Sequence, residues 1–219
     1  MSNHEIIFVN DSFTGGHYAL KNKKAKNAFK NPMQSCKSIK LFPSDIVVDI
    51  GAYVGEYALY ASRFAKQVIA YEASPYIFEV LKMNSRDNIR LHNKAVVGDD
   101  RKETQLYLSK GMGATNSIVK KIRKKNSICV ECANYTEIVK PATVVKIDVE
   151  GAEYGYDIVQ PHLRAIILEF HPISGIPLGG WRGKAVQIME EIQLKGFTPT
   201  MVPSFKNGWD TNSAWARPA

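Results

Sequence analysis

The hydrophobic and polar positions of this chain fall into two alternating patterns from Asp45 onward. Compact runs of apolar and β-branched residues, each of strand length, recur at 45–50, 67–72, 89–97, 143–148 and 165–170. Segments with helical spacing separate or follow them, at 55–65, 75–84, 152–159 and 182–195. Because buried parallel strands form continuous apolar runs joined by crossover helices, this order predicts an α/β fold: a mostly parallel sheet with helices on both faces.

Three stretches depart from this alternation. Gly98-Asp99-Asp100 followed by ETQLYLS predicts a β-hairpin, and residues 127–139 predict a further strand that runs into a short helix. Residues 110–126 have no clear period, so we expect a loop that faces the substrate.

The first predicted strand runs into the turn DIGAYVG, in which Gly51 and Gly55 precede a helix. Glycine allows close approach of the backbone to a ligand, and the helix N-terminus attracts an anionic group. Asp49 is placed to meet a cationic amino group. The next strand ends at Glu72, where a carboxylate can accept hydrogen bonds from ribose hydroxyls. The pattern favours a nucleoside cofactor, and the alternatives are a structural turn and a surface glutamate.

The spacing of the turn separates two cofactors. A dinucleotide pyrophosphate requires the amides of G-x-G-x-x-G, whereas this turn is G-x-x-x-G with Tyr53 in place of the middle glycine. A cofactor without phosphates, such as S-adenosylmethionine, fits better than NAD.

Acidic and histidine side chains follow the last two predicted parallel strands. Asp148 and Glu150 come at the carboxyl end of one strand, where ligands bind in parallel sheets, although helix capping is the alternative for Glu150 and Glu153. Glu169 and His171 alternate at the end of the next strand and so lie on one face. A hydroxyl that acts as a nucleophile needs a proton acceptor, and His171 or Glu169 is the candidate; a structural strand-end histidine is the alternative.

We assign no metal ligands from the sequence. Cys129-x-x-Cys132 lacks the second ligand pair of a zinc site, and buried strand cysteines are the simpler interpretation. One alternative stays open, in which Mg²⁺ lies beside a diol substrate and is held by Asp148, Glu150, Glu169 and His171.

Three motifs together resemble the FkbM-like methyltransferases, over about residues 45–171. The family pattern DIGAN-x-G, a FEP-like string and KIDVEGAE is matched here by DIGAYVG, YEASP and KIDVEGAE. The resemblance implies a Rossmann-like class I methyltransferase fold with a C-terminal antiparallel strand, S-adenosylmethionine as cofactor, and O-methylation. We therefore expect the cofactor-binding residues to be Asp49, Gly51, Ala52, Tyr53, Gly55, Glu72, Ala73, Ala95, Val96 and Asp148. The candidate catalytic residues are Asp148, Glu150, Glu169 and His171.

Composition adds a domain plan and a question about partners. The 219 residues, 45% of them hydrophobic, suit a basic N-terminal extension at 1–40 that caps the active site and one methyltransferase domain at 41–219. We find no long apolar segment and no leader, so we expect a cytoplasmic protein without a membrane partner. The net charge is +8, with lysine clusters at 20–40 and 120–125. These clusters are either solvated loops or a surface for a polyanion such as nucleic acid.

The sequence therefore predicts an enzyme that methylates a hydroxyl of a sugar or small metabolite. An RNA or other nucleic-acid methyltransferase is the first alternative, because of the lysine clusters. A non-catalytic binding module with the same fold is the second. The sequence does not specify the oligomeric state.

Overall fold

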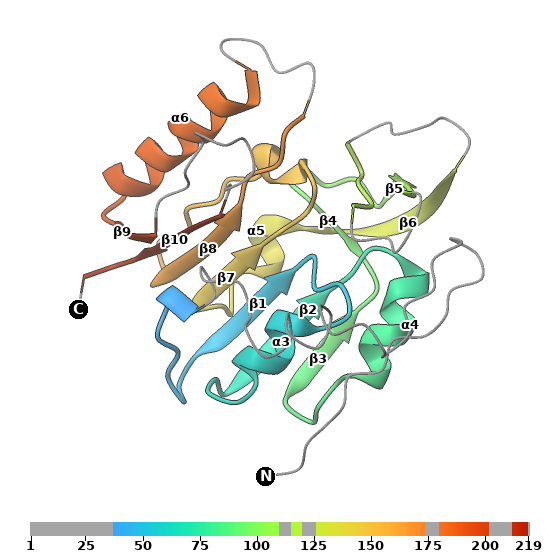
Figure 1. Ribbon diagram of the computed structural model, residues 1–219, viewed down its shortest axis with the longest axis horizontal. Helices are drawn as coiled ribbons and strands as arrows, with labels where there is room; N and C mark the ends of the chain where they lie inside the picture. Colours follow the sequence, from blue (N-terminus) through green and yellow to red (C-terminus); the bar gives the residue numbers. More distant parts are fainter. Residues whose placement is uncertain (1–36, 110–114, 120–125, 174–179, 202–211, 219) are drawn as a thin grey trace, which may run out of the picture.

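The computed structural model describes residues 37–109, 115–119, 126–173, 180–201 and 212–218 (Figure 1). The predicted extension at 1–40 lies outside the described residues up to residue 36, as do 110–114 and 120–125 of the predicted loop. None of the helices in the described ranges is long and apolar enough to cross a membrane.

A seven-stranded sheet in the order β3-β2-β1-β7-β8-β10-β9 forms the centre of the molecule (Figure 1). Its strands are β1 (Ile46–Ile50), β2 (Gln67–Tyr71), β3 (Ile89–His92), β7 (Val144–Ile147), β8 (Ala165–Glu169), β9 (Thr198–Met201) and β10 (Asn212–Ala216). The first five run parallel, whereas β10 pairs antiparallel with both β8 and β9. The predicted mostly parallel sheet with a C-terminal antiparallel strand is confirmed.

Helices cover both faces of this sheet. In the described part of the chain they are α3 (Glu56–Ala61), α4 (Pro75–Met83), α5 (Tyr135–Ile138) and α6 (Gly180–Leu194). Because successive strand residues point to opposite faces, Val47 packs in a core with α3 and α4, and Val48 packs in a second core with α5 and α6. The predicted helices that correspond to α3, α4 and α6 are confirmed, and α3 is shorter than predicted.

A smaller sheet corrects two of the predictions. Its order is β4-β6-β5, with β4 at Ala95–Val97, β5 at Glu103–Tyr107 and β6 at Ser127–Asn134. The predicted strand 89–97 is wrong as a single strand. After β3 the Asn93 amide donates to the backbone oxygen of Glu72 at 2.8 Å, and the chain leaves the main sheet. The predicted hairpin after Gly98 is also wrong, because β4 and β5 each pair with β6. The predicted strand and short helix at 127–139 are β6 and α5, and are confirmed.

The predicted helix at 152–159 is wrong beyond its first turn. Only a 3-10 turn, η1 (Ala152–Gly155), forms there, and Tyr156 is already extended. The Tyr156 ring stacks on that of Tyr135 with centroids 4.8 Å apart, and its hydroxyl donates to the Val96 backbone oxygen at 2.9 Å. This buried anchor holds the chain beside β4 and so prevents the helix from continuing.

Candidate functional site

The turn after β1 is held in a conformation that requires glycine. Gly51 has φ 76°, and a Cβ atom there would lie only 1.8 Å from the Asp148 backbone oxygen. The amides of Gly51 and Ala52 both donate to the Tyr71 backbone oxygen, at 3.0 and 2.9 Å. The turn is therefore fixed between the ends of β2 and β7, and no larger residue fits at its first position.

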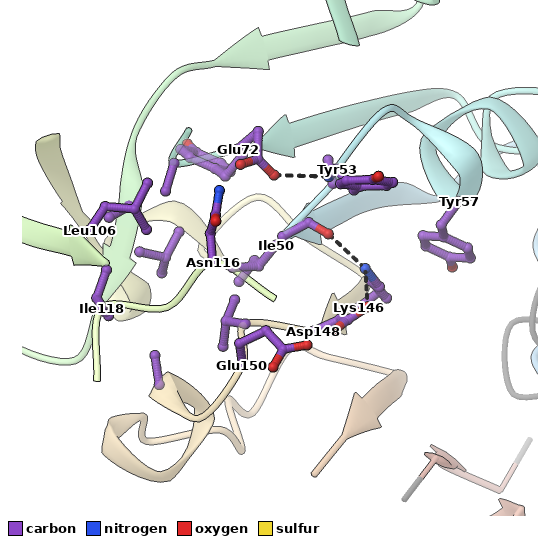
Figure 2. A pocket seen from close by; sticks show the side chains of 18 of the residues that line it. Ile50, Tyr53, Tyr57, Glu72, Leu106, Asn116, Ile118, Lys146, Asp148 and Glu150 are labelled. Atoms are coloured by element: carbon purple, nitrogen blue, oxygen red, sulfur yellow. Dashed lines mark hydrogen bonds and ion pairs between the residues drawn. The ribbon is translucent and has the colours of Figure 1, made fainter. Parts of the chain in front are cut away.

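A cavity of about 280 Å³ opens beside this turn, at the carboxyl edge of the parallel strands. In Figure 2, Leu106 and Ile118 lie at one end of it, and Tyr53 and Lys146 lie at the other. Of the predicted site residues, it is lined by Gly51, Ala52, Tyr53, Glu72, Ala73, Ala95, Val96, Asp148 and Glu150. Asp49, Gly55, Glu169 and His171 do not line it.

Several lining residues were missed by the sequence analysis. They are Ile50, Glu56, Tyr57, Tyr71, Leu106, Asn116, Ile118, Lys146, Val149 and Ala152. Leu106 belongs to the small sheet, and Ile118 follows the bridge between Ser117 and Tyr107. Leu106 and Ile118 reach the cavity only because strands pair across the small sheet, and the sequence has no local signal for that pairing.

Glu72 connects the turn to the start of α4. Its carboxylate accepts from the Tyr53 amide at 3.0 Å and from the Ser74 amide at 2.8 Å. The side chain is buried, and burial raises the pKa of Glu72 to about 7, although both amide hydrogen bonds oppose the shift. The carboxylate thus lies in the cavity wall while fixing the backbone on either side of it (Figure 2).

A buried ion pair lies beneath the glycine turn. Asp49 is fully buried, and its carboxylate lies 3.3 Å from Nζ of Lys146. Lys146 Nζ also donates to the Gly51 backbone oxygen at 2.9 Å and lies 3.4 Å from the carboxylate of Asp148. Burial raises the pKa of Asp49, and Lys146 opposes that shift. Asp49 therefore acts on the cavity through Lys146, and its predicted direct contact with a cofactor amino group stays a prediction.

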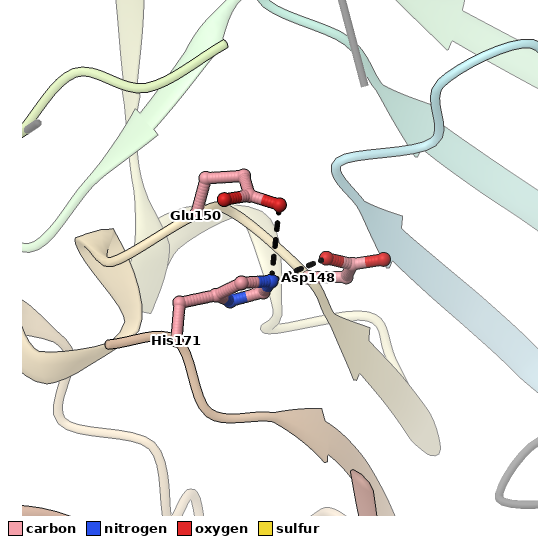
Figure 3. Close-up of side chains that lie close together, drawn as sticks. All are labelled: Asp148, Glu150 and His171. Atoms are coloured by element: carbon pink, nitrogen blue, oxygen red, sulfur yellow. Dashed lines mark ion pairs between the residues drawn. The ribbon is translucent and has the colours of Figure 1, made fainter. Parts of the chain in front are cut away.

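The acidic residues and the histidine after β7 and β8 meet in one cluster. His171 Nε2 lies 3.2 Å from Glu150 and 3.5 Å from Asp148 (Figure 3). It also lies 3.8 Å from Glu169. On the other side of the ring, Nδ1 lies 3.4 Å from the fully buried carboxylate of Glu153. The four candidate catalytic residues are thus neighbours, and Asp148 and Glu150 belong to both the cluster and the cavity wall.

The surroundings of His171 affect its predicted role as a base. Burial lowers the pKa of His171, but its interactions with the Glu150 and Glu153 carboxylates outweigh burial and raise the pKa to about 10. An imidazolium cannot accept a proton, so with these neighbours alone His171 is the poorer of the two predicted bases. Burial raises the pKa of Glu169, which makes that carboxyl group the better acceptor.

Comparison with known proteins gives likeness in structure only. No protein-family model and no curated protein matches the sequence. The methyltransferase FkbM from Methylobacillus flagellatus KT is similar over 81% of this chain and 44% of its own, with a TM-score of 0.54 and 12% identity. Precorrin-6y C5,15-methyltransferase from Geobacter metallireducens GS-15 is similar over 98% of this chain and 97% of its own, with a TM-score of 0.47 and 12% identity. An rRNA methylase from Streptococcus thermophilus is similar over 92% of this chain and 100% of its own, with a TM-score of 0.46 and 10% identity.

The strand order and this likeness give the chain the Rossmann-like fold of the class I methyltransferases. The chain spans less than half of the length of the Methylobacillus protein. At this identity the likeness is one of fold alone.

Proposed function

We propose that this chain is an S-adenosylmethionine-dependent methyltransferase that methylates an oxygen, in a hydroxyl group of a sugar or small metabolite. One observation carries the proposal: a single cavity joins the Gly51 turn, the Glu72 carboxylate and the acidic end of β7. These three features suit the three polar parts of S-adenosylmethionine: its amino-acid end, its ribose hydroxyls and its cationic sulfonium, in that order. The FkbM-like motifs point the same way, and O-methylation is the activity that the resemblance implies.

The two ends of the cavity suit the two ends of the cofactor. At one end Ala73, Ala95, Val96, Leu106 and Ile118 supply an apolar surface for adenine. Glu72 follows, with carboxylate oxygens that can accept hydrogen bonds from the ribose hydroxyls.

The polar end holds the amino-acid part and the reacting group. The Gly51 turn brings backbone close to the methionine moiety, and the Lys146 ammonium attracts its carboxylate. S-adenosylmethionine supplies an electrophilic methyl group on a sulfonium. The carboxylates of Asp148 and Glu150 stabilise that positive charge and orient the donor.

Transfer to a hydroxyl requires removal of the hydroxyl proton. The oxygen forms a bond to the methyl carbon while the bond from carbon to sulfur breaks, and the proton goes to a carboxylate. Glu169 is our candidate base, because burial raises its pKa and it lies in the cluster, 3.8 Å from His171 Nε2 and outside the cavity wall. The acceptor would then approach from the side of β8.

Incubation with labelled S-adenosylmethionine and separate pools of sugars, small hydroxylated metabolites and RNA tests the proposal. We expect label in the sugar or metabolite pool, in a product that resists mild base as a methyl ether does. An Asp148→Asn variant should transfer at least about 100-fold more slowly, in the range of losses of an electrostatic catalytic group. Label in no pool, although the cofactor binds, would support a non-catalytic binding module instead.

An RNA acceptor is the second candidate, and the net charge of +8 favours it. The lysine clusters at 20–40 and 120–125 lie almost entirely outside the described residues. RNA binding should weaken with salt, with a slope of log affinity on log salt of about −0.7 per neutralised phosphate. A flat response would reject the RNA acceptor. The cytoplasmic location stays a prediction from composition.

A further inference from the structure

We propose that Asp148, Glu150 and His171 form a binding site for one divalent transition-metal cation of the Mn²⁺ type. Three ligand atoms, one from each residue, lie within 4.8 Å of one another (Figure 3). They come from the ends of two adjacent parallel strands, β7 and β8, which hold the backbone on both sides of the site.

The spacing of the ligand atoms fits a single small cation. Metal–ligand bonds of about 2.1 Å at right angles place neighbouring ligand atoms about 3.0 Å apart, and opposite ones about 4.2 Å apart. The distances from His171 Nε2 are 3.2 Å to Glu150 and 3.5 Å to Asp148. Small side-chain rotations would therefore complete a three-ligand set on one side of the ion.

Glu153 supplies an independent observation on the far side of the imidazole. Its buried carboxylate lies 3.4 Å from His171 Nδ1 and also accepts from the His171 backbone amide at 2.7 Å. Nδ1 itself makes no hydrogen bond within the described residues, but the carboxylate is close enough to receive its proton after a small rotation of the ring. Metal-binding histidines commonly donate the proton of their other ring nitrogen to a carboxylate. With the proton on Nδ1, the Nε2 lone pair faces Asp148 and Glu150.

The charges of the cluster also favour a cation. Asp148, Glu150, Glu153 and Glu169 place four carboxylates around one imidazole, and Lys146 is the nearby ammonium group among the described residues. Carboxylates crowded at a partly buried edge repel one another, and a divalent ion offsets that repulsion.

The mixed donor set decides which class of metal fits. Mg²⁺ and Ca²⁺ prefer oxygen alone, whereas imidazole suits transition metals and carboxylates suit hard ions such as Mn²⁺. With three protein ligands, positions on the ion stay open for other oxygen ligands. If the proposed function is correct, an acceptor with two neighbouring oxygens would bind there, and the metal would lower the pKa of the reacting hydroxyl.

Titration of the full chain with Mn²⁺, followed by electron paramagnetic resonance without cofactor, tests the site. We expect one bound Mn²⁺ per chain, with His171→Gln and Glu150→Gln each weakening binding at least 100-fold. Glu137→Gln is the matched control, because Glu137 is an exposed carboxylate on α5. It should bind Mn²⁺ as the unaltered chain does.

Glu153→Gln separates a metal site from a merely structural cluster. The glutamine keeps a hydrogen-bond acceptor but loses the charge, so Mn²⁺ affinity should fall by about 10- to 100-fold, while thermal unfolding shows that the variant is folded. Nitrogen hyperfine coupling to Mn²⁺ should be present in the unaltered chain and absent in His171→Gln. Loss of affinity in Glu137→Gln, or no stoichiometric Mn²⁺ in the unaltered chain, would overturn the site.

The Mn²⁺ titration can fail or succeed independently of the proposed methyltransferase function. If the chain binds Mn²⁺ but not S-adenosylmethionine, the metal site stands and the methyltransferase proposal is contradicted. If it binds S-adenosylmethionine but not Mn²⁺, the methyltransferase proposal stands and the metal site is overturned; His171 is then an imidazolium paired with the carboxylates.

Discussion

Asp49 and Lys146 occupy paired positions on the adjacent parallel strands β1 and β7, and their charged groups lie 3.3 Å apart in the interior. The same ammonium group donates to Gly51 in the turn that borders the cavity. Because a buried charge is costly without its partner, this ion pair couples the stability of the sheet to the shape of the candidate cofactor site.

Lys146→Met should lower the free energy of unfolding by about 3–5 kcal/mol, because it leaves the Asp49 carboxylate buried without its cation. Urea unfolding measures the loss. The double variant Asp49→Asn with Lys146→Met should recover much of it, since neither charge remains. Lys82→Met, which removes an exposed partner of Glu79, is the control and should change stability by less than about 1 kcal/mol. A Lys146→Met loss as small as that of the control would refute the coupling.

Gly51→Ala should prevent cofactor binding and destabilise the fold, because the added Cβ would lie 1.8 Å from the Asp148 backbone oxygen at a φ of 76°. Strain of this kind costs about 1–3 kcal/mol before the clash is counted. Gly155→Ala is the matched control, since no atom of the described residues lies within 4 Å of its added Cβ. Calorimetric titration with S-adenosylmethionine and urea unfolding of both variants would show whether the effects separate as expected.

The raised pKa of Glu72 predicts two opposite pH trends. An ionised carboxylate is the better acceptor for ribose hydroxyls, so cofactor affinity should increase as the pH rises through about 7. The contribution of Glu72 to the stability of the fold changes in the opposite direction and decreases as the pH rises. Its folded pKa lies above the ordinary 4.5, so the stabilisation is full below about pH 4.5 and is lost as the pH rises through 7. Both trends should vanish in Glu72→Gln, and a pH-independent affinity in the unaltered chain would contradict the assigned role.

Glu169→Gln tests the candidate base. Methyl transfer should slow by about 10²- to 10⁴-fold, the usual contribution of general base catalysis, while cofactor affinity stays within a factor of two or three. Cofactor affinity should change little because Glu169 does not line the cavity. Single-turnover rates and calorimetry measure the two quantities separately. Equal losses in rate and affinity would mean that Glu169 supports the cofactor site instead.

The main sheet was predictable because its buried parallel strands form apolar runs that are visible locally. The break at Asn93 was not, because it depends on a hydrogen bond to Glu72, which follows the neighbouring strand β2. Lys146 was missed as a lining residue for a similar reason. Its importance follows from the register that places it beside Asp49, and a sequence does not specify register between strands 97 residues apart.

Part of the candidate site could be predicted from the sequence and part could not. The turn around Gly51 and the carboxylate of Glu72 lie at strand ends, where a short sequence motif is enough to predict their positions. The wall formed by Leu106 and Ile118 depends on the small sheet, in which β6 unexpectedly lies between β4 and β5. Contacts that depend on such long-range pairing become visible only in the folded structure.

Calorimetric titration with S-adenosylmethionine at pH 8 tests whether the cavity binds the cofactor. We expect one cofactor per chain, a loss of at least about tenfold in affinity for Glu72→Gln, and unchanged affinity for Glu79→Gln, an exposed carboxylate on α4. A tenfold loss corresponds to about 1.4 kcal/mol, which is within the usual contribution of a hydrogen bond to a charged group. No binding to the unaltered chain, or equal affinity in all three proteins, would contradict the cofactor site proposed for this cavity.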